Sequence, residues 1–185
     1  MNITYVTGNK AKIESARQIL EPLGFTIDNI KMDVTEIQAD TIEEIAKYSA
    51  EEACNKLNSP VLKNDSGLVI DALNGFPGPY THYVDDTIGE DGILRLMDGI
   101  SNRRAHFEEV LAYSVPGKET VTFKSITNGT IAYEKSGTYG WSYDFIFIPD
   151  ESDKTLGNYP DSERFAFWNS DAYIELAKYL KKEKD

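Results

Sequence analysis

The chain has 185 residues, of which 41% are hydrophobic, and its 31 Asp and Glu residues outnumber its 19 Lys and Arg residues to give a formal net charge of −12. Such a chain can bury a sizeable core, but its negative charge repels duplex nucleic acid and anionic membranes. An anionic small molecule would need local basic residues, helix N-termini or a metal ion. The single cysteine, Cys54, has no partner for an intrachain disulfide, and no apolar run is long enough to cross a membrane, so we expect a cytoplasmic protein of one domain.

The first predicted elements are a strand, a turn and a helix. A β-rich run from Ile3 to Val6 leads into Thr7-Gly8-Asn9, and helical spacing begins at Lys10. Asn9 is the expected N-cap. Backbone N–H groups in such a turn, the helix dipole and the charge of Lys12 favour a phosphate group. Ordinary helix capping explains the same residues, because the turn lacks the GxxxxGK[ST] pattern.

A second strand is predicted from Phe25 to Met32, and a second helix begins after Thr41, which forms a capping box with Glu44. Glu36 lies in the loop between them. It is either a solvated acidic side chain or one ligand of a metal ion shared with Asp65.

The stretch from Leu62 to Tyr80 is the centre of the prediction. Pro60, Val61 and Leu62 read as a short buried strand that ends at Asp65-Ser66-Gly67. A carboxylate at the end of a strand lies where α/β sheets bind ligands. The Gly75–Pro79 cluster then forms a tight turn. The alternative is that Asp65 only caps its own loop as an Asx-turn.

Later segments predict a mixed sheet. A short helix covers Gly92–Met97, and the strands Arg104–Val115 and Thr120–Ala132 flank a turn at Pro116-Gly117. A parallel strand arrangement near the start and an antiparallel hairpin later imply a mixed sheet with helices packed on it.

Glycines and aromatic residues share the segment from Gly137 to Asp144, which precedes a strand at Phe145–Ile148. Trp141 is suited to stack on a planar ring, and Asp144 to hydrogen-bond the edge of that ring. The alternative is that these aromatics close the edge of the sheet. Lys154–Asn169 is expected to be irregular, and Ser170 to begin the last helix.

Four blocks, in this order, resemble the inosine/xanthosine triphosphate pyrophosphatase family. They are Thr7-Gly8-Asn9-Lys10-Ala11-Lys12, Glu36-Ile37-Gln38, Asp65-Ser66-Gly67-Leu68 with Gly75-Phe76-Pro77-Gly78-Pro79-Tyr80, and Ser142-Tyr143-Asp144. The resemblance spans nearly the whole chain. It implies one α/β domain over residues 1–185, with an elongated mixed β-sheet flanked by helices, two lobes, a nucleotide cleft between the lobes, and a homodimer.

The resemblance also implies a reaction, the Mg²⁺-dependent hydrolysis of ITP, dITP or XTP to the monophosphate and pyrophosphate. Glu36 and Asp65 would hold the Mg²⁺ ion, and Asp65 would act as general base on the attacking water. The residues implied to bind the substrate phosphates are Thr7, Gly8, Asn9, Lys10, Ala11, Lys12, Ser66 and Arg164. Those implied to line the base and sugar pocket are Trp141, Ser142, Tyr143, Asp144, Trp168 and Asn169.

The chain departs from the family pattern at three places. Asn64 replaces the first of two acids, which removes a carboxylate for a second metal, and Trp141 replaces a stacking Phe. In Glu163–Asn169, Arg164 takes the place of a Lys, and Phe167-Trp168-Asn169 that of the Ser-His-Arg triplet that reads the purine 6-oxo group. Aromatic stacking tolerates every base, so an altered base preference is expected. The alternative function is a nucleotide-binding protein that has lost turnover.

Overall fold

The computed structural model describes residues 1–183, so the last two residues of the predicted domain lie outside the described part. Its strands are β1 Asn2–Val6, β2 Thr26–Ile30, β3 Val61–Ile70, β4 Arg104–Ser114, β5 Val121–Ile131 and β6 Phe147–Pro149. Its α-helices are α1 Lys10–Leu20, α2 Ile42–Leu57, α3 Thr81–Thr87, α4 Gly89–Leu96, α5 Asp161–Arg164 and α6 Asp171–Lys182. Short 3-10 turns lie at Glu21–Leu23, Asp71–Leu73, Gly78–Tyr80, Ser142–Phe145, Leu156–Asn158 and Phe165–Phe167.

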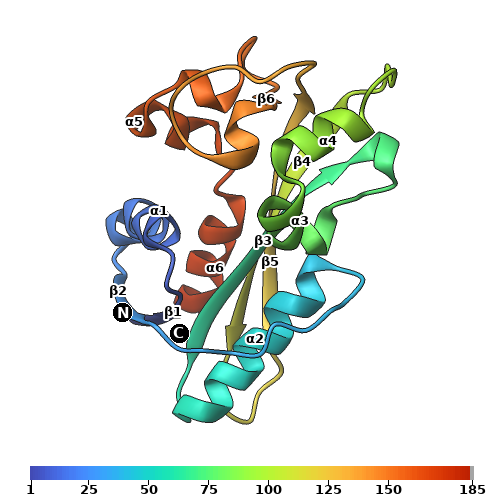
Figure 1. Ribbon diagram of the computed structural model, residues 1–185. Coiled ribbons are helices and arrows are strands. Elements are labelled where there is room, and N and C mark those ends of the chain that lie inside the picture. Colours follow the sequence, from blue (N-terminus) through green and yellow to red (C-terminus); the bar gives the residue numbers. More distant parts are fainter. Residues whose placement is uncertain (184–185) are drawn as a thin grey trace. The chain divides into compact units, whose positions relative to one another are not determined.

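All the strands belong to one six-stranded sheet in the order β2-β1-β3-β4-β5-β6 (Figure 1). β1 runs parallel to both β2 and β3, whereas β5 and β6 are antiparallel. The predicted mixed α/β sheet with flanking helices is therefore confirmed.

The chain divides into two compact units. Unit 1 comprises residues 1–65, 109–125 and the described residues from Ser170 onward, and unit 2 comprises Ser66–Glu108 and Ile126–Asn169. β3, β4 and β5 each supply residues to both units.

Unit 1 has helices on both faces of its strands. Alternate residues of a strand point to opposite faces, so each strand packs against helices on both sides. On one face, Tyr5 and Leu62 are buried in a cluster with residues of α1 and α6, which lie side by side in Figure 1. On the other face, Val6 and Val61 pack against Cys54 of α2. Cys54 is thus a buried free thiol.

Unit 2 has its own core. Leu68 and Ile70 of β3, with Phe147 of β6, pack among apolar residues of α3, α4 and the Ser142–Phe145 turn. Phe107 of β4 packs its ring edge-to-face against Phe147, with ring centroids 4.9 Å apart. Such an edge-to-face pair stabilises the core beyond the apolar area that it buries.

Three local predictions are corrected. β3 does not end at Asp65 but runs on to Ile70, so Asp65 lies within a strand of ten residues. The register pair Tyr5–Leu62 shows that β3 continues past the end of β1 at Val6, while β4 remains its neighbour on the other side. β6 begins at Phe147 because Phe145 belongs to a 3-10 turn, and helix α3 was not predicted.

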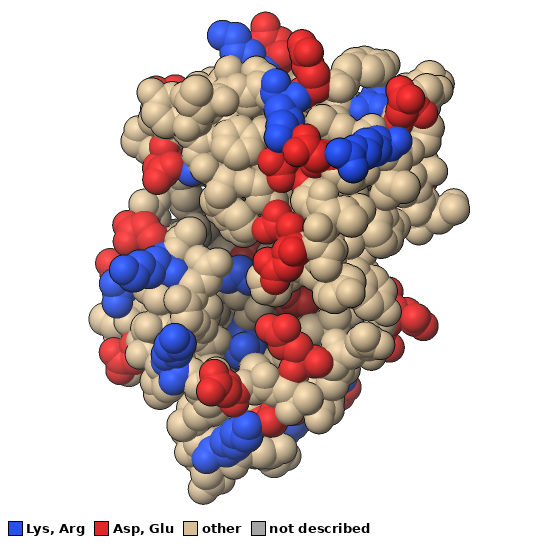
Figure 2. All heavy atoms as spheres, viewed as in Figure 1, with Lys and Arg blue, Asp and Glu red and all other residues tan. Residues whose placement is uncertain are grey.

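Charged side chains of both signs are scattered over the face seen in Figure 2. Within residues 1–183, no helix combines the length and apolar character needed to span a membrane.

Candidate active site

In unit 1, the turn after β1 is held by its own side chains. The Asn9 Oδ1 accepts hydrogen bonds from the backbone N–H groups of Ala11 (2.9 Å) and Lys12 (3.3 Å), and the Thr7 hydroxyl accepts one from the Asn9 N–H (3.1 Å). Asn29 of β2 donates its amide to the Thr7 carbonyl at 2.7 Å. The N-cap prediction is confirmed. The Asn9 side chain thus already accepts two of the first backbone N–H groups of α1. The positive charge of this turn is therefore supplied by the side chain of Lys12.

The loop that carries Glu36 is fastened to α2. Glu52 accepts the Thr35 N–H at 2.7 Å and forms an ion pair with Lys56 at 2.6 Å, while Lys56 also donates to the Asp33 carbonyl at 3.1 Å. The hydrogen bond from Lys56 is the main cause that lowers the pKa of Glu52. Glu36 follows Thr35 directly and is exposed. Its backbone position is therefore set while its carboxylate remains accessible.

Lys63 and Asp65 lie two residues apart on β3 and so point to the same face of the strand. Burial lowers the pKa of the Lys63 ammonium, and nearby Lys12 lowers it further. The carboxylates whose charges oppose this shift are Asp65, Glu36 and Glu52. Lys12, Glu36 and Asp65 each act electrostatically on Lys63, and we call these four residues the charged group.

Asn64 points to the opposite face of β3. Its side chain is 7% exposed, and its amide donates to the Glu109 Oε1 at 2.8 Å, the same oxygen that accepts the Tyr173 hydroxyl at 3.0 Å. The residue at this position therefore belongs to a polar contact among β3, β4 and α6. Alternation along the strand directs residue 64 away from the side on which Asp65 lies.

The predicted metal ligands of unit 1 are the two carboxylates Glu36 and Asp65, a donor type that suits Mg²⁺. Among residues 1–183, no three His, Cys, Asp or Glu side chains are grouped so that they could hold a metal ion. Mg²⁺ is commonly bound through one or two carboxylates together with substrate phosphates and water. Glu36 and Asp65 both oppose the lowering of the Lys63 pKa, so both carboxylates lie near enough to act on that ammonium group.

In unit 2, the segment Trp141–Asp144 combines one exposed ring with anchored neighbours. Trp141 is 64% exposed. Ser142 donates its hydroxyl to Asp85 of α3, and the Tyr143 hydroxyl donates to the Thr81 carbonyl at 2.9 Å. Tyr143 is only 5% exposed and belongs to the core of the unit, where burial raises the pKa of its hydroxyl. Of these four residues, Trp141 presents the free aromatic face.

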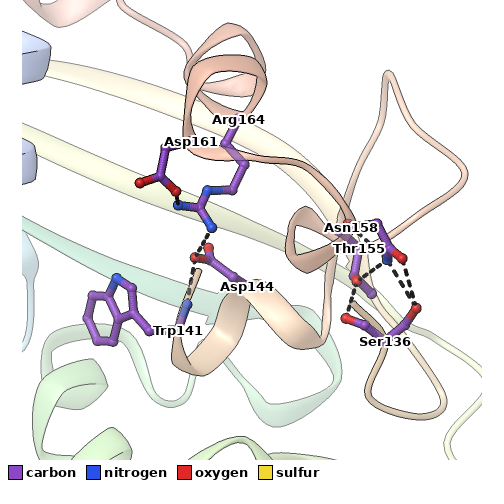
Figure 3. Close-up of polar contacts among 7 residues, drawn as sticks. All are labelled: Ser136, Trp141, Asp144, Thr155, Asn158, Asp161 and Arg164. Carbon is purple, nitrogen blue, oxygen red and sulfur yellow. Dashed lines mark hydrogen bonds and ion pairs between the residues drawn. The ribbon is translucent and has the colours of Figure 1, made fainter. Parts of the chain in front are cut away.

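Asp144 is engaged from two directions (Figure 3). Its Oδ2 accepts the Trp141 backbone N–H at 3.1 Å and lies 3.2 Å from the Arg164 Nη1. Arg164 also donates to Asp161 through its Nη2. Burial raises the pKa of the Asp144 carboxyl, while the Trp141 N–H and the Arg164 guanidinium act in the opposite direction.

Trp168 and Asn169 also contact their own unit. The Trp168 ring meets Phe107 edge-to-face with centroids 5.1 Å apart, and the Asn169 N–H donates to the Thr127 hydroxyl at 3.0 Å. Ser66 is the first residue of unit 2 and is partly buried.

The predicted site residues thus fall into two sets. Unit 1 contains Thr7–Lys12, Glu36 and Asp65, and unit 2 contains Ser66, Trp141–Asp144, Arg164, Trp168 and Asn169. Sequence reasoning missed Lys63 and Glu52. The alternation of side chains along β3 places Lys63 and Asp65 on one face, but this follows only when the strand is extended through both residues. No local sequence pattern indicates that Glu52 contacts the Glu36 loop.

Known proteins resemble the chain over most of its length. The Ham1 family model matches residues 3–167. A dITP/XTP pyrophosphatase of Methanopyrus kandleri is 47% identical over 156 residues, which cover 84% of this chain and 83% of that protein. A dITP/XTP pyrophosphatase of Thermococcus kodakarensis is 41% identical over 182 residues, 98% of each chain. The structure of the Staphylococcus aureus Ham1 protein matches with a TM-score of 0.84 at 30% identity, over 99% of this chain and 100% of that one.

Proposed function

Since the chain belongs to the Ham1 family, we propose that it is a nucleoside triphosphate pyrophosphatase, a hydrolase acting on acid anhydrides. The proposed substrates are the non-standard purine nucleotides ITP, dITP and XTP. The proposed products are the nucleoside monophosphate and pyrophosphate.

The observation that carries this proposal is the charged group of unit 1. Lys12 and Lys63 supply positive charge for an anionic substrate, and Glu36 and Asp65 supply oxygen ligands for a divalent cation. A chain with a net charge of −12 needs such a local arrangement to hold a triphosphate.

In the proposed reaction, Asp65 takes a proton from the water that attacks the α-phosphorus. The bond between the α-phosphorus and the bridging oxygen breaks, and pyrophosphate leaves. Glu36 and Asp65 are the residues that would hold Mg²⁺, which when bound offsets the charge of the triphosphate and polarises its phosphoryl oxygens. Lys12 and Lys63 would contact phosphate oxygens and so lower the cost of bringing the triphosphate to an acidic protein.

Trp141 is the proposed stacking partner of the base. Its ring is exposed, and stacking on an aromatic face does not distinguish one base from another. Because Asp144 is already paired with Arg164 and with the Trp141 N–H, it has less capacity to read the base edge. We therefore propose a broader base preference than a Ser-His-Arg triplet would impose.

The testing experiment is a substrate panel. The protein is incubated with Mg²⁺ and separately with ITP, dITP, XTP, ATP and GTP, and the release of pyrophosphate is measured for each. We expect release from ITP, dITP and XTP and its loss when EDTA removes the metal. Absence of pyrophosphate from every nucleotide would contradict the proposal.

A second candidate function is nucleotide binding without turnover, favoured by the altered segment Glu163–Asn169. Calorimetric binding of the same nucleotides with no pyrophosphate release would support it.

The family resemblance also implies a homodimer, which light scattering tests: we expect twice the chain mass of 20.8 kDa.

A further inference from the structure

The exposed ring of Trp141 depends on a short backbone segment that is held at several points. Ser142 and Tyr143 are anchored to α3 through Asp85 and Thr81. Neither contact reaches the backbone N–H of Trp141. That N–H donates to the Asp144 carboxylate at 3.1 Å, so the Trp141 backbone depends on where this carboxylate lies.

Arg164 forms an ion pair with that carboxylate. Its Nη1 lies 3.2 Å from the Asp144 Oδ2, and the two side chains are 13% and 14% exposed. At the other side of the guanidinium, Nη2 donates to Asp161, whose side chain is 88% exposed. Figure 3 shows the guanidinium between the two carboxylates, with the Trp141 ring directed away from it.

Gly140 shows how closely this pair packs against the chain. A Cβ atom at this position would lie 1.9 Å from the Arg164 Nη1 and 2.2 Å from the Asp144 Oδ2. The backbone φ of Gly140 is also +76°, a conformation that favours glycine. The ion pair therefore packs directly against the residue that precedes Trp141.

We propose that Arg164 is a positioning residue: it holds Asp144, and through Asp144 the Trp141 backbone, so that the aromatic ring is presented in a fixed place before any nucleotide binds. The use of this ring for a base rests on the proposed function. The positioning itself does not.

The alternative is that Arg164 contacts substrate phosphates, as the family resemblance implies. The structure favours positioning, because both terminal nitrogens of Arg164 face carboxylates of the same unit. Moving Arg164 to a phosphate would also leave the buried Asp144 carboxylate without its cation, which is costly.

Hydrogen exchange of the Trp141 amide, followed by NMR without nucleotide, tests the proposal in Arg164→Met. We expect exchange at least about tenfold faster than in the wild type, since the carboxylate that accepts this N–H is no longer held. The Ile146 amide, which donates to the Tyr143 carbonyl at 3.0 Å, is the internal control and should be unchanged. Arg104→Met is the matched control, because Arg104 pairs with Asp150 at 2.6 Å in the same unit.

Two further variants separate positioning from folding and from phosphate contact. Asp161→Asn leaves Arg164 in place but removes its exposed charged partner, and should speed Trp141 exchange by a smaller factor even if Arg164→Met fails to fold. Arg164→Lys should restore slow exchange in part. In kinetics, Arg164→Met should raise the KM for inosine triphosphate and the inhibition constant of inosine monophosphate by about the same factor.

Unchanged Trp141 exchange in folded Arg164→Met, or in Asp161→Asn if Arg164→Met does not fold, would overturn the proposal. So would a loss of affinity that grows with the number of phosphates, which would assign Arg164 to the phosphates. The exchange results are independent of the pyrophosphatase proposal, because the exchange measurement needs no substrate. If the substrate panel released no pyrophosphate, Arg164 would still be tested.

Discussion

The two units use charge in opposite ways. In unit 1, the charges of Lys12, Glu36 and Asp65 all act on Lys63, and an exposed loop carries Glu36. In unit 2, the ion pair between Asp144 and Arg164 is largely buried and packs against Gly140, while the exposed group is the uncharged ring of Trp141.

Chemistry is therefore expected in unit 1 and recognition of the base in unit 2. Charges that remain accessible can bind metal and phosphate, and a half-buried cation beside carboxylates is typical of functional sites. Charges that are paired inside a unit fix geometry but have little left to offer a ligand. We therefore expect variants in unit 1 to affect turnover, and variants in unit 2 to affect mainly the binding and choice of the base.

The largest effect is expected from Asp65→Asn. Removing the general base should lower kcat by about 10²- to 10⁴-fold while the fold remains intact. Steady-state pyrophosphate release and thermal melting measure the two properties, with the exposed Asp98→Asn as control. Wild-type turnover in Asp65→Asn would show that the charged group of unit 1 is not the catalytic centre.

Trp141→Ala should act on KM rather than kcat. Stacking of a base on an aromatic residue contributes about 1–3 kcal/mol, so KM should rise by roughly 5- to 150-fold for every base. Trp141→Phe should keep most of the affinity. Tyr83→Ala, which removes another exposed ring of unit 2, is the control; an equal loss in that variant would show that the effect is not specific to position 141.

Lys63→Met sharpens the role of unit 1. Loss of a charge-assisted contact to phosphate, worth about 1.5–3 kcal/mol, should raise KM for triphosphates by about tenfold or more and make it less sensitive to salt. Lys178→Met removes an exposed lysine of the same unit and should have no such effect. A KM unchanged in Lys63→Met would place this lysine outside the phosphate contacts.

The smallest effect is expected from Glu52→Gln, because Glu52 holds the Glu36 loop and, of the three carboxylates that act on Lys63, contributes least. Weakening its bonds to Thr35 and Lys56 should raise the Mg²⁺ concentration for half-maximal activity by about two- to fivefold. The neighbouring Glu51→Gln is the control. A change in Glu51→Gln as large as that in Glu52→Gln would mean that the loop is not held as the structure indicates.

Local signals in the sequence predicted much of this fold. The family assignment made from the four blocks is confirmed, as are the Asn9 cap, the Thr41–Glu44 capping box and the mixed sheet. Each depends on residues close in the chain or on strand periodicity.

What the sequence did not predict depends on partners far apart in the chain. The Ser-Gly step after Asp65 reads as a turn, yet β3 continues because β4 pairs with it. The side on which Asn64 lies follows from that longer strand. Arg164 and Asp144 are 20 positions apart, and no local pattern shows that they meet.

The most direct test of the central claim is whether Glu36 and Asp65 hold the same Mg²⁺ ion. Calorimetry would measure Mg²⁺-dependent binding of a non-hydrolysable ITP analogue to the wild type, Glu36→Gln, Asp65→Asn and the double variant. We predict strong non-additivity, with the double variant little weaker than either single one, and a coupling of at least about 1.4 kcal/mol, or tenfold. Additive losses would show that the two carboxylates act on separate ligands and would contradict the account.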